Sequence, residues 1–218
     1  MPELLQNRLE AGQRLADLLL DYAGREDVVV LALPRGGVPV GAEIADRLEA
    51  PLDVYPVRKL GAPQQPELAM GAIAPGNACI LNENVVRSLG ISEDQIEQVA
   101  ANERRELERR ETLYRKGRQR CSAEGKVAIM VDDGLATGAS MKIAVEAVQH
   151  EQPAAVVVAV GTAPPSTVTE LEQRDDIDRV EAAVMPRMFL GVGGSYADFA
   201  QTTDDEVIAC LDKTRAPA

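Results

Sequence analysis

Two adjacent carboxylates, Asp132 and Asp133, lie in the string AIMVDDGLATGAS at residues 128–140, between an apolar strand pattern and a predicted helix. Gly138 permits a tight backbone curl, and the amides at the helix start point into the loop. Such amides, with the hydroxyls of Thr137 and Ser140, suit a phosphate dianion. We expect the acids to face sugar hydroxyls or hydrated Mg²⁺, because carboxylates accept hydrogen bonds from hydroxyls and from metal-bound water. The string therefore predicts a site for a phosphorylated sugar.

A second candidate stretch, LPRGGV at residues 33–38, follows another apolar run. Phosphate oxygens need amides and a guanidinium at close range, and Arg35 supplies the guanidinium. Gly36 and Gly37 let the backbone approach such a ligand closely. Arg58 and Lys59 follow a third apolar run, where they supply positive charge to an anionic ligand or begin a solvated loop.

The elements that must position these residues follow from apolar patterning. Five short runs rich in Val, Ile, Leu or Ala lack strict alternation, as strands covered on both faces do. These runs are Val28–Leu33, Leu52–Val57, Val127–Val131, Ala155–Val160 and Val180–Val184. The helical stretches that separate most of them are Val38–Leu48, Ala139–Gln149 and Ser166–Gln173. Strands that alternate with helices predict an α/β fold, with a parallel five-stranded sheet and helices on both sides.

One segment interrupts this alternation, and we expect a single domain over residues 1–218 with an inserted mobile loop and helical segment at about 60–120. Lys59–Pro75 is punctuated by Gly and Pro, which predicts a long loop or a hairpin. Ser92–Lys116 is then predicted to be one long polar helix, with Ser92 and Gln95 spaced as in a capping box.

Composition excludes several classes of function. The chain has 218 residues and a net charge of −12, so long-range repulsion opposes general binding to nucleic acid or an anionic membrane. A single histidine, His150, removes most Ser-His-Asp, Cys-His and multi-histidine metal sites. The three cysteines include no CxxC pair, and the first 20 residues predict an amphipathic helix without the layout of a secretory signal. We therefore expect a cytoplasmic protein.

The string AIMVDDGLATGAS resembles the phosphoribosyl pyrophosphate signature of the type I phosphoribosyltransferases, in which four apolar residues and two acids precede a T-G-x-T/S loop. It departs from that signature at Gly134, where most of the family has an apolar residue. LPRGGV is similar to the pyrophosphate loop of xanthine phosphoribosyltransferases, and Val57-Arg58-Lys59 resembles the base of the mobile catalytic loop of adenine and orotate phosphoribosyltransferases. Nearly the whole chain resembles a group of bacterial predicted phosphoribosyltransferases of unassigned substrate.

This resemblance implies the transfer of a phosphoribosyl group from phosphoribosyl pyrophosphate to a nitrogen acceptor, typically a nucleobase, with Mg²⁺ as cofactor. It implies catalytic roles for Asp132, Asp133, Arg35 and Lys59. The ligand-binding set comprises Arg35, Gly36, Gly37, Arg58, Lys59, Asp132, Asp133, Ala136, Thr137, Gly138, Ala139 and Ser140. No direct protein ligand to the metal is expected, because substrate and water hold Mg²⁺ near the two acids. By the same resemblance, the Pro34–Arg35 peptide bond is cis.

Three points stay open at this stage. A non-catalytic sensor of phosphoribosyl pyrophosphate or of nucleotides shares this fold, and a phosphosugar hydrolase is a third alternative. Ala136 replaces the aspartate that usually contacts the purine in 6-oxopurine enzymes, so we predict little activity with hypoxanthine, guanine or xanthine. Neither the acceptor nor the oligomeric state, including a homo-oligomer, follows from the sequence.

Overall fold

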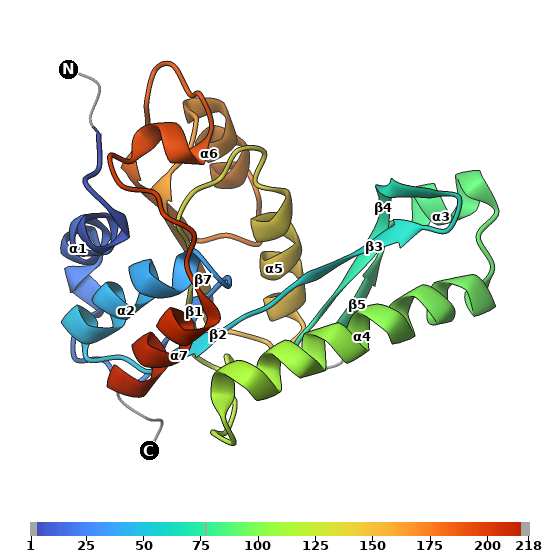
Figure 1. The fold of residues 1–218 in the computed structure, drawn as a ribbon, viewed down its shortest axis with the longest axis horizontal. Coiled ribbons are helices and arrows are strands. Elements are labelled where there is room, and N and C mark those ends of the chain that lie inside the picture. Colours follow the sequence, from blue (N-terminus) through green and yellow to red (C-terminus); the bar gives the residue numbers. More distant parts are fainter. Residues whose placement is uncertain (1–3, 77, 215–218) are drawn as a thin grey trace.

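The protein, described here by a computed structural model of residues 4–76 and 78–214, has a five-stranded parallel sheet at its centre (Figure 1). The strand order is β2-β1-β6-β7-β8. Its strands are β1 (Val28–Ala32), β2 (Leu52–Val54), β6 (Val127–Asp132), β7 (Ala155–Thr162) and β8 (Arg179–Val184). The predicted parallel five-stranded sheet is thus confirmed, although β2 is shorter than the predicted Leu52–Val57. Pro56, which has no N–H to donate, falls in the part of that run that does not join the sheet.

Helices cover both faces of this sheet, as the continuous apolar runs predict. The flanking helices are α1 (Arg8–Leu18), α2 (Gly37–Leu48), α5 (Ala139–Gln149), α6 (Pro165–Glu172) and α7 (Asp204–Lys213). Successive strand residues point to opposite faces, so Val28 and Val30 of β1 pack with α1, α2 and α7. Val29 and Leu31 pack on the other side, with α5 and α6. All four valine and leucine side chains are almost fully buried.

Helix starts follow from capping side chains. Asn7 accepts a hydrogen bond from the Glu10 amide, so α1 begins at Arg8. The predicted amphipathic helix, which covered the first 20 residues, therefore started too early. Helix α7 was not predicted; it begins after Thr203, which forms a capping box with Glu206. None of the helices in the described ranges combines the length and apolarity that crossing a bilayer requires.

A second, three-stranded antiparallel sheet projects from the first, and we call it and its two helices the arm (Figure 1). The arm comprises β3 (Arg58–Ala62), β4 (Gln65–Ala74), β5 (Ala78–Leu81), α3 (Glu83–Leu89) and α4 (Glu93–Arg115). The hairpin expected within Lys59–Pro75 is β3–β4, whereas β5 and α3 were not predicted. The capping box of Ser92 and Gln95 is present at the start of α4. The arm has a small apolar core of its own, in which Leu60 and Met70 pack against Ala100 and Leu107.

A buried ion pair holds the arm to the sheet. Arg115, the last residue of α4, donates its Nε–H to Asp53 Oδ1 at 2.9 Å, within the edge strand β2. The Asp53 carboxylate also accepts the amides of Val54 and Cys121, and its residue is only 4% exposed. A buried carboxylate with this many donors is well satisfied, so the end of α4 is fixed against β2.

The sheet order creates a switch point between β1 and β6. From β1 the chain next adds β2 on one side, and from β6 it adds β7 and β8 on the other. In open parallel sheets, ligands bind outside the carboxyl ends of the strands at such a point. The two candidate stretches, LPRGGV and DDGLATGAS, are the segments that follow β1 and β6.

Candidate functional site

The loops after β1 and β6 pack directly against each other. The amide of Leu33 donates to the Val131 carbonyl at 2.8 Å, which continues the ladder of the two strands to their ends. A Cβ added to Gly37 would lie 2.6 Å from that same carbonyl oxygen. No side chain fits there, so glycine is required for the loop to approach β6. The Pro34–Arg35 peptide bond is cis, as the resemblance implies.

Gly36 brings the first loop against the second acid. A Cβ at Gly36 would lie 2.0 Å from Asp133 Oδ2, so the carboxylate occupies the space that a side chain would fill. Backbone amides of the LPRGGV loop and the twin acids are therefore neighbours in space, although about a hundred residues separate them in the chain. The structure brings together Gly36, Gly37, Asp132 and Asp133.

Each of the two acids has one oxygen engaged by the protein. Asp132 accepts the amide of Asp133 on Oδ1 at 2.8 Å. Asp133 accepts the Nε–H of Arg8 on Oδ2 at 2.8 Å, and Arg8 Nη2 lies 2.7 Å from the same oxygen as an ion pair. Among the hydrogen bonds of the described residues, Asp132 Oδ2 and Asp133 Oδ1 accept none. The pair thus presents two carboxylate oxygens that suit two hydroxyl donors.

The two acids lie in an electrostatically unfavourable environment. Burial, and secondly the neighbouring Asp133 carboxylate, raise the pKa of Asp132 well above its usual range. The positive charge of Arg8 acts in the opposite direction on the pKa of Asp132, but more weakly. A group held in so costly an environment is typical of a functional site.

The loop after the acids is open to solvent. Thr137, Ala139 and Ser140 are exposed, and Gly138 has a φ of +70°, the left-handed conformation that favours glycine. Helix α5 begins at Ala139, so its free amides face this loop. Thr167 of α6 donates its hydroxyl to the Ala136 carbonyl at 2.8 Å and so ties the loop to the next helix.

The structure accounts for Gly134, the position that departs from the family signature. A Cβ there would lie 2.5 Å from Val192 Cγ1 and 2.8 Å from Thr162 Cγ2. Val192 belongs to the short helical turn η2 (Val192–Ser195), which packs onto the residues after the acids. Val192 and Thr162 thus occupy the space that a side chain at position 134 would need.

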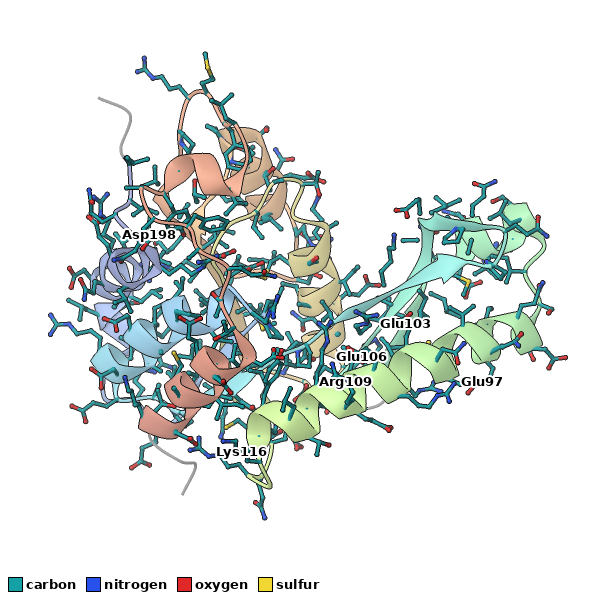
Figure 2. The ribbon with its side chains drawn as sticks, in the orientation of Figure 1. Glu97, Glu103, Glu106, Arg109, Lys116 and Asp198 are labelled. Carbon is teal, nitrogen blue, oxygen red and sulfur yellow. The ribbon has the colours of Figure 1, made fainter. Side chains whose placement is uncertain are left out.

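Each of the remaining predicted cations pairs with a carboxylate other than Asp132 or Asp133. Arg58 pairs with Glu103 of α4, with Nε to Oε2 at 2.7 Å, and Lys59 contacts Glu67 across the hairpin at 3.5 Å. Figure 2 shows Glu103 partway along α4, in the arm. In the same view, Asp198 marks the edge beside α1, on the opposite side of the molecule. The guanidinium of Arg35 lies 3.7 Å from Asp204 at the start of α7.

Arg8 and Thr167 are contact residues of these loops that sequence reasoning missed. Nothing local marks Arg8, which precedes Asp133 by 125 residues and was expected only as part of an amphipathic helix. Tyr196 and Phe199 are packed against these residues. The Tyr196 hydroxyl donates to the Asp133 carbonyl, and the Phe199 ring contacts both Arg8 and Tyr196.

Two cavities of about 330 Å³ each lie at the base of the arm, and no predicted site residue lines either of them. One lies against α4 and contacts Arg104 and Glu108; the other contacts Arg120 and His150. Within residues 4–76 and 78–214, no three His, Cys, Asp or Glu side chains are grouped to hold a metal ion. Two adjacent carboxylates are nevertheless the oxygen-rich surroundings in which Mg²⁺ bound by phosphates and water is found.

Comparison with protein families and curated proteins gives a consistent result. A family model described as a phosphoribosyl transferase domain matches residues 3–183. Two proteins of Mycobacterium tuberculosis strains, each named "Putative phosphoribosyl transferase", are 43% identical over 211 residues. The match covers 97% of this chain and 47% of each relative, so the chain spans about half the length of these curated relatives.

Solved structures extend the comparison to the fold. A crystal structure of a protein from Thermus thermophilus is 42% identical, with a TM-score of 0.83, and the match covers 97% of this chain and 98% of that one. A hypothetical protein from Neisseria gonorrhoeae, crystallised with bound ppGpp, is 11% identical with a TM-score of 0.51 and 97% coverage of both chains. At that identity, the second likeness concerns the fold alone.

Proposed function

The chain belongs to the phosphoribosyl transferase family, and from that premise we propose that it transfers a phosphoribosyl group from phosphoribosyl pyrophosphate to a nitrogen acceptor, a nucleobase, and releases pyrophosphate. In this reaction the bond from C1 of the ribose to the pyrophosphate oxygen breaks. A bond from C1 to the acceptor nitrogen forms, and the acceptor loses a proton. The observation that supports the proposal most strongly is the meeting of two loops, Pro34–Gly37 and Asp132–Ser140, at the switch point of the sheet.

Each loop has a part in the proposal. Asp132 and Asp133 accept the ribose hydroxyls through the two oxygens that no described residue engages. The amides around Gly138 and the hydroxyls of Thr137 and Ser140 hold the 5′-phosphate, and Ala136 and Ala139 leave this loop open. Arg35, Gly36 and Gly37 hold the pyrophosphate group.

The transition state explains why positioning the substrates and stabilising the developing charges are sufficient for the reaction. C1 acquires positive charge while negative charge grows on the leaving oxygen, so the protein needs no nucleophile of its own. Mg²⁺ would enter on the pyrophosphate and offset its negative charge, with the two acids nearby. This charge compensation matters in a chain of net charge −12. Removal of Mg²⁺ with a chelator is therefore expected to abolish binding of phosphoribosyl pyrophosphate; equal affinity with and without the metal would contradict this part of the scheme.

The arm is proposed to complete the site. Arg58 and Lys59 supply charge to the departing pyrophosphate when residues 60–75 of the hairpin close over it. Closure would exclude water, which otherwise hydrolyses the activated sugar. Because both cations are paired within the arm, this step requires Arg58 to leave Glu103 and Lys59 to leave Glu67.

Pyrophosphate release against a panel of nucleobases tests the proposal. Release that depends on a base indicates a transferase, release without a base indicates a hydrolase, and binding without release indicates a sensor. Asp133→Asn is the variant control, because it keeps the size of the side chain and removes its charge. The panel also tests the acceptor prediction from Ala136, since rapid turnover of hypoxanthine, guanine or xanthine would contradict it.

A further inference from the structure

The guanidinium of Arg8, at the edge of the site, contacts Asp133, Ala200 and Phe199. Its Nε donates to Asp133 Oδ2, its Nη2 lies 2.7 Å from the same oxygen, and its Nη1 donates to the Ala200 carbonyl at 2.7 Å. Its Cζ lies 4.0 Å from the centroid of the Phe199 ring. The side chains of Arg8 and Asp133 are 13% and 14% exposed. The side chains of an exposed ion pair are not held in this way, because they remain free to change rotamer.

Two segments far apart in the sequence meet to build this arrangement. Leu5 and Tyr196 form a parallel bridge, in which the Leu5 amide donates to the Ser195 carbonyl and the Ala197 amide donates to the Leu5 carbonyl. The Asp198 amide donates to the Gln6 carbonyl and continues the bridge toward Arg8. The segment that supplies Arg8 and the segment that supplies Phe199 are thus held together by backbone hydrogen bonds.

The direction of the Arg8 contact decides what Asp133 can offer. The Nε–H group of Arg8 binds Oδ2, Nη2 lies beside the same oxygen, and the backbone of Gly36 closes the space next to it. The carboxylate cannot rotate without losing a charge-assisted hydrogen bond and a close ion pair. Asp133 Oδ2 is therefore engaged by Arg8, and Oδ1 is the oxygen that remains to accept a donor from a ligand.

We propose that Arg8 is a positioning residue for the sugar: by holding Asp133, it aligns the acid pair with the two neighbouring hydroxyls of the ribose. This inference rests on the proposed function, because it assigns the ligand of the same site. Arginine suits the role better than lysine, since its fork brings Nε and Nη2 to one oxygen while its flat face stacks on Phe199. Arg8 acts through Asp133 and has no contact of its own with the substrate.

The test measures discrimination between sugars, which a general loss of structure would not change. Calorimetry with ribose 5-phosphate and with 2-deoxyribose 5-phosphate gives the preference of the protein for the intact diol. In Arg8→Gln this preference is expected to fall by about tenfold, because one directed, charge-assisted hydrogen bond to the diol is lost. Binding of pyrophosphate with Mg²⁺ is expected to change less than about twofold, since Arg8 does not contact that group.

Arg14→Gln is the matched control. Arg14 lies on the same helix and pairs with Glu10 at 2.8 Å, a surface pair four residues apart. Its variant should keep the wild-type preference for the diol. Should Arg8→Gln fold poorly, Arg8→Lys and Arg14→Lys replace the two variants, with a fall of about threefold expected for the former and none for the latter.

A double-mutant cycle decides whether Arg8 acts through Asp133. If it does, Arg8→Gln adds no further loss of diol preference in the Asp133→Asn background. Additive losses, or weakened pyrophosphate binding, would place Arg8 on the ligand itself and overturn the inference. Equal preferences in Arg8→Gln and Arg14→Gln would also overturn it. A wild-type protein that binds neither phosphoribosyl pyrophosphate nor ribose 5-phosphate would instead refute the proposed function, so the two failures are distinguishable.

Discussion

The central sheet and the arm both supply predicted site residues, but they hold them by different forces. At the sheet, β1 and β6 pair without interruption from Val28–Val127 to Ala32–Val131, and the strands are buried on both faces. In the arm, β3 and β4 pair with register shifts at Gly61, and the first half of β4 is exposed. The arm cations are held by partly exposed ion pairs, which contribute little to stability.

In the proposed reaction, this difference separates two tasks. The acids and amides that we propose to bind the sugar and its phosphates follow strands that cannot shift without breaking the core. The cations that we propose to act while pyrophosphate leaves lie on an element whose ion pairs can be exchanged at low cost. The arm nevertheless has one firm attachment, the buried pair of Arg115 and Asp53 at its root. Four substitutions test this comparison, and we order them by the free energy each is expected to change.

The first substitution breaks the firm attachment. Arg115→Gln leaves the Asp53 carboxylate buried without its cation, which typically costs about 3–5 kcal/mol of unfolding free energy. Urea denaturation measures this loss, and hydrogen exchange should show α4 and the hairpin exchanging faster than β1 and β6. Arg109→Gln is the control, because Arg109 forms an exposed pair with Glu106 on the same helix (Figure 2). Equal stability of the two variants would mean that the arm is not fixed at this root.

The second substitution removes the strained acid of the sheet. Asp132→Asn is expected to lower turnover by about 10²- to 10³-fold, the usual cost of losing one charged contact to a transition state. It should also raise the melting temperature, because a raised pKa means that the ionised carboxyl is destabilising in the folded chain.

The pH dependence of that gain has a definite sign. The pKa of Asp132 is higher in the folded chain than in the unfolded chain, in which aspartates titrate at about 4. Between these two pKa values the folded state binds more protons, so its stability falls as the pH rises. The advantage of Asp132→Asn over wild type should therefore grow from about pH 4 upward. Asp175→Asn, at an exposed aspartate, should give no such growing difference.

The third substitution disturbs the contact between the two loops. In Gly36→Ala the new methyl group meets the Asp133 carboxylate, so either the loop or the acid must move. A displacement of about 1 Å costs on the order of 10²-fold in turnover, and overpacking costs about 1–3 kcal/mol of stability. Gly194→Ala, whose added Cβ would lie 3.3 Å from the Leu190 Cβ, is the control for steady-state kinetics. A Gly36→Ala enzyme with normal turnover would show that the loop contact is dispensable.

The sheet and its acids could be predicted from the sequence because local patterns determine them. Buried parallel strands have continuous apolar runs, and the acids stand where such a run ends, so the segments after β1 and β6 were identified without coordinates. The contact between Gly36 and Asp133 could not be predicted in this way, because it depends on the strand order β2-β1-β6-β7-β8, which apolar patterns do not encode.

Three features had no local signal in the sequence. Arg8 reaches Asp133 only because the bridge of Leu5 and Tyr196 brings two distant segments to the same edge. In the arm, β5 has just four residues and α3 lacks buried positions, so neither has the periodicity from which an element is predicted. The departure at Gly134 likewise became intelligible only when Val192 was found in the space beside it.

The fourth substitution has the smallest expected effect and addresses the exchangeable contacts. Glu103→Gln removes the partner that holds Arg58 in the arm, so Arg58 is freer to move toward departing pyrophosphate. Since a partly exposed pair is worth at most about 1 kcal/mol, turnover should rise by no more than about fivefold, with stability changed by less than about 1 kcal/mol. Glu97→Gln is the matched control, because Glu97 pairs with Arg104 on the same helix and holds neither predicted cation. A fall in turnover in Glu103→Gln alone would mean that the pair positions Arg58 for the reaction rather than retaining it, and the arm would then be as firmly organised as the sheet.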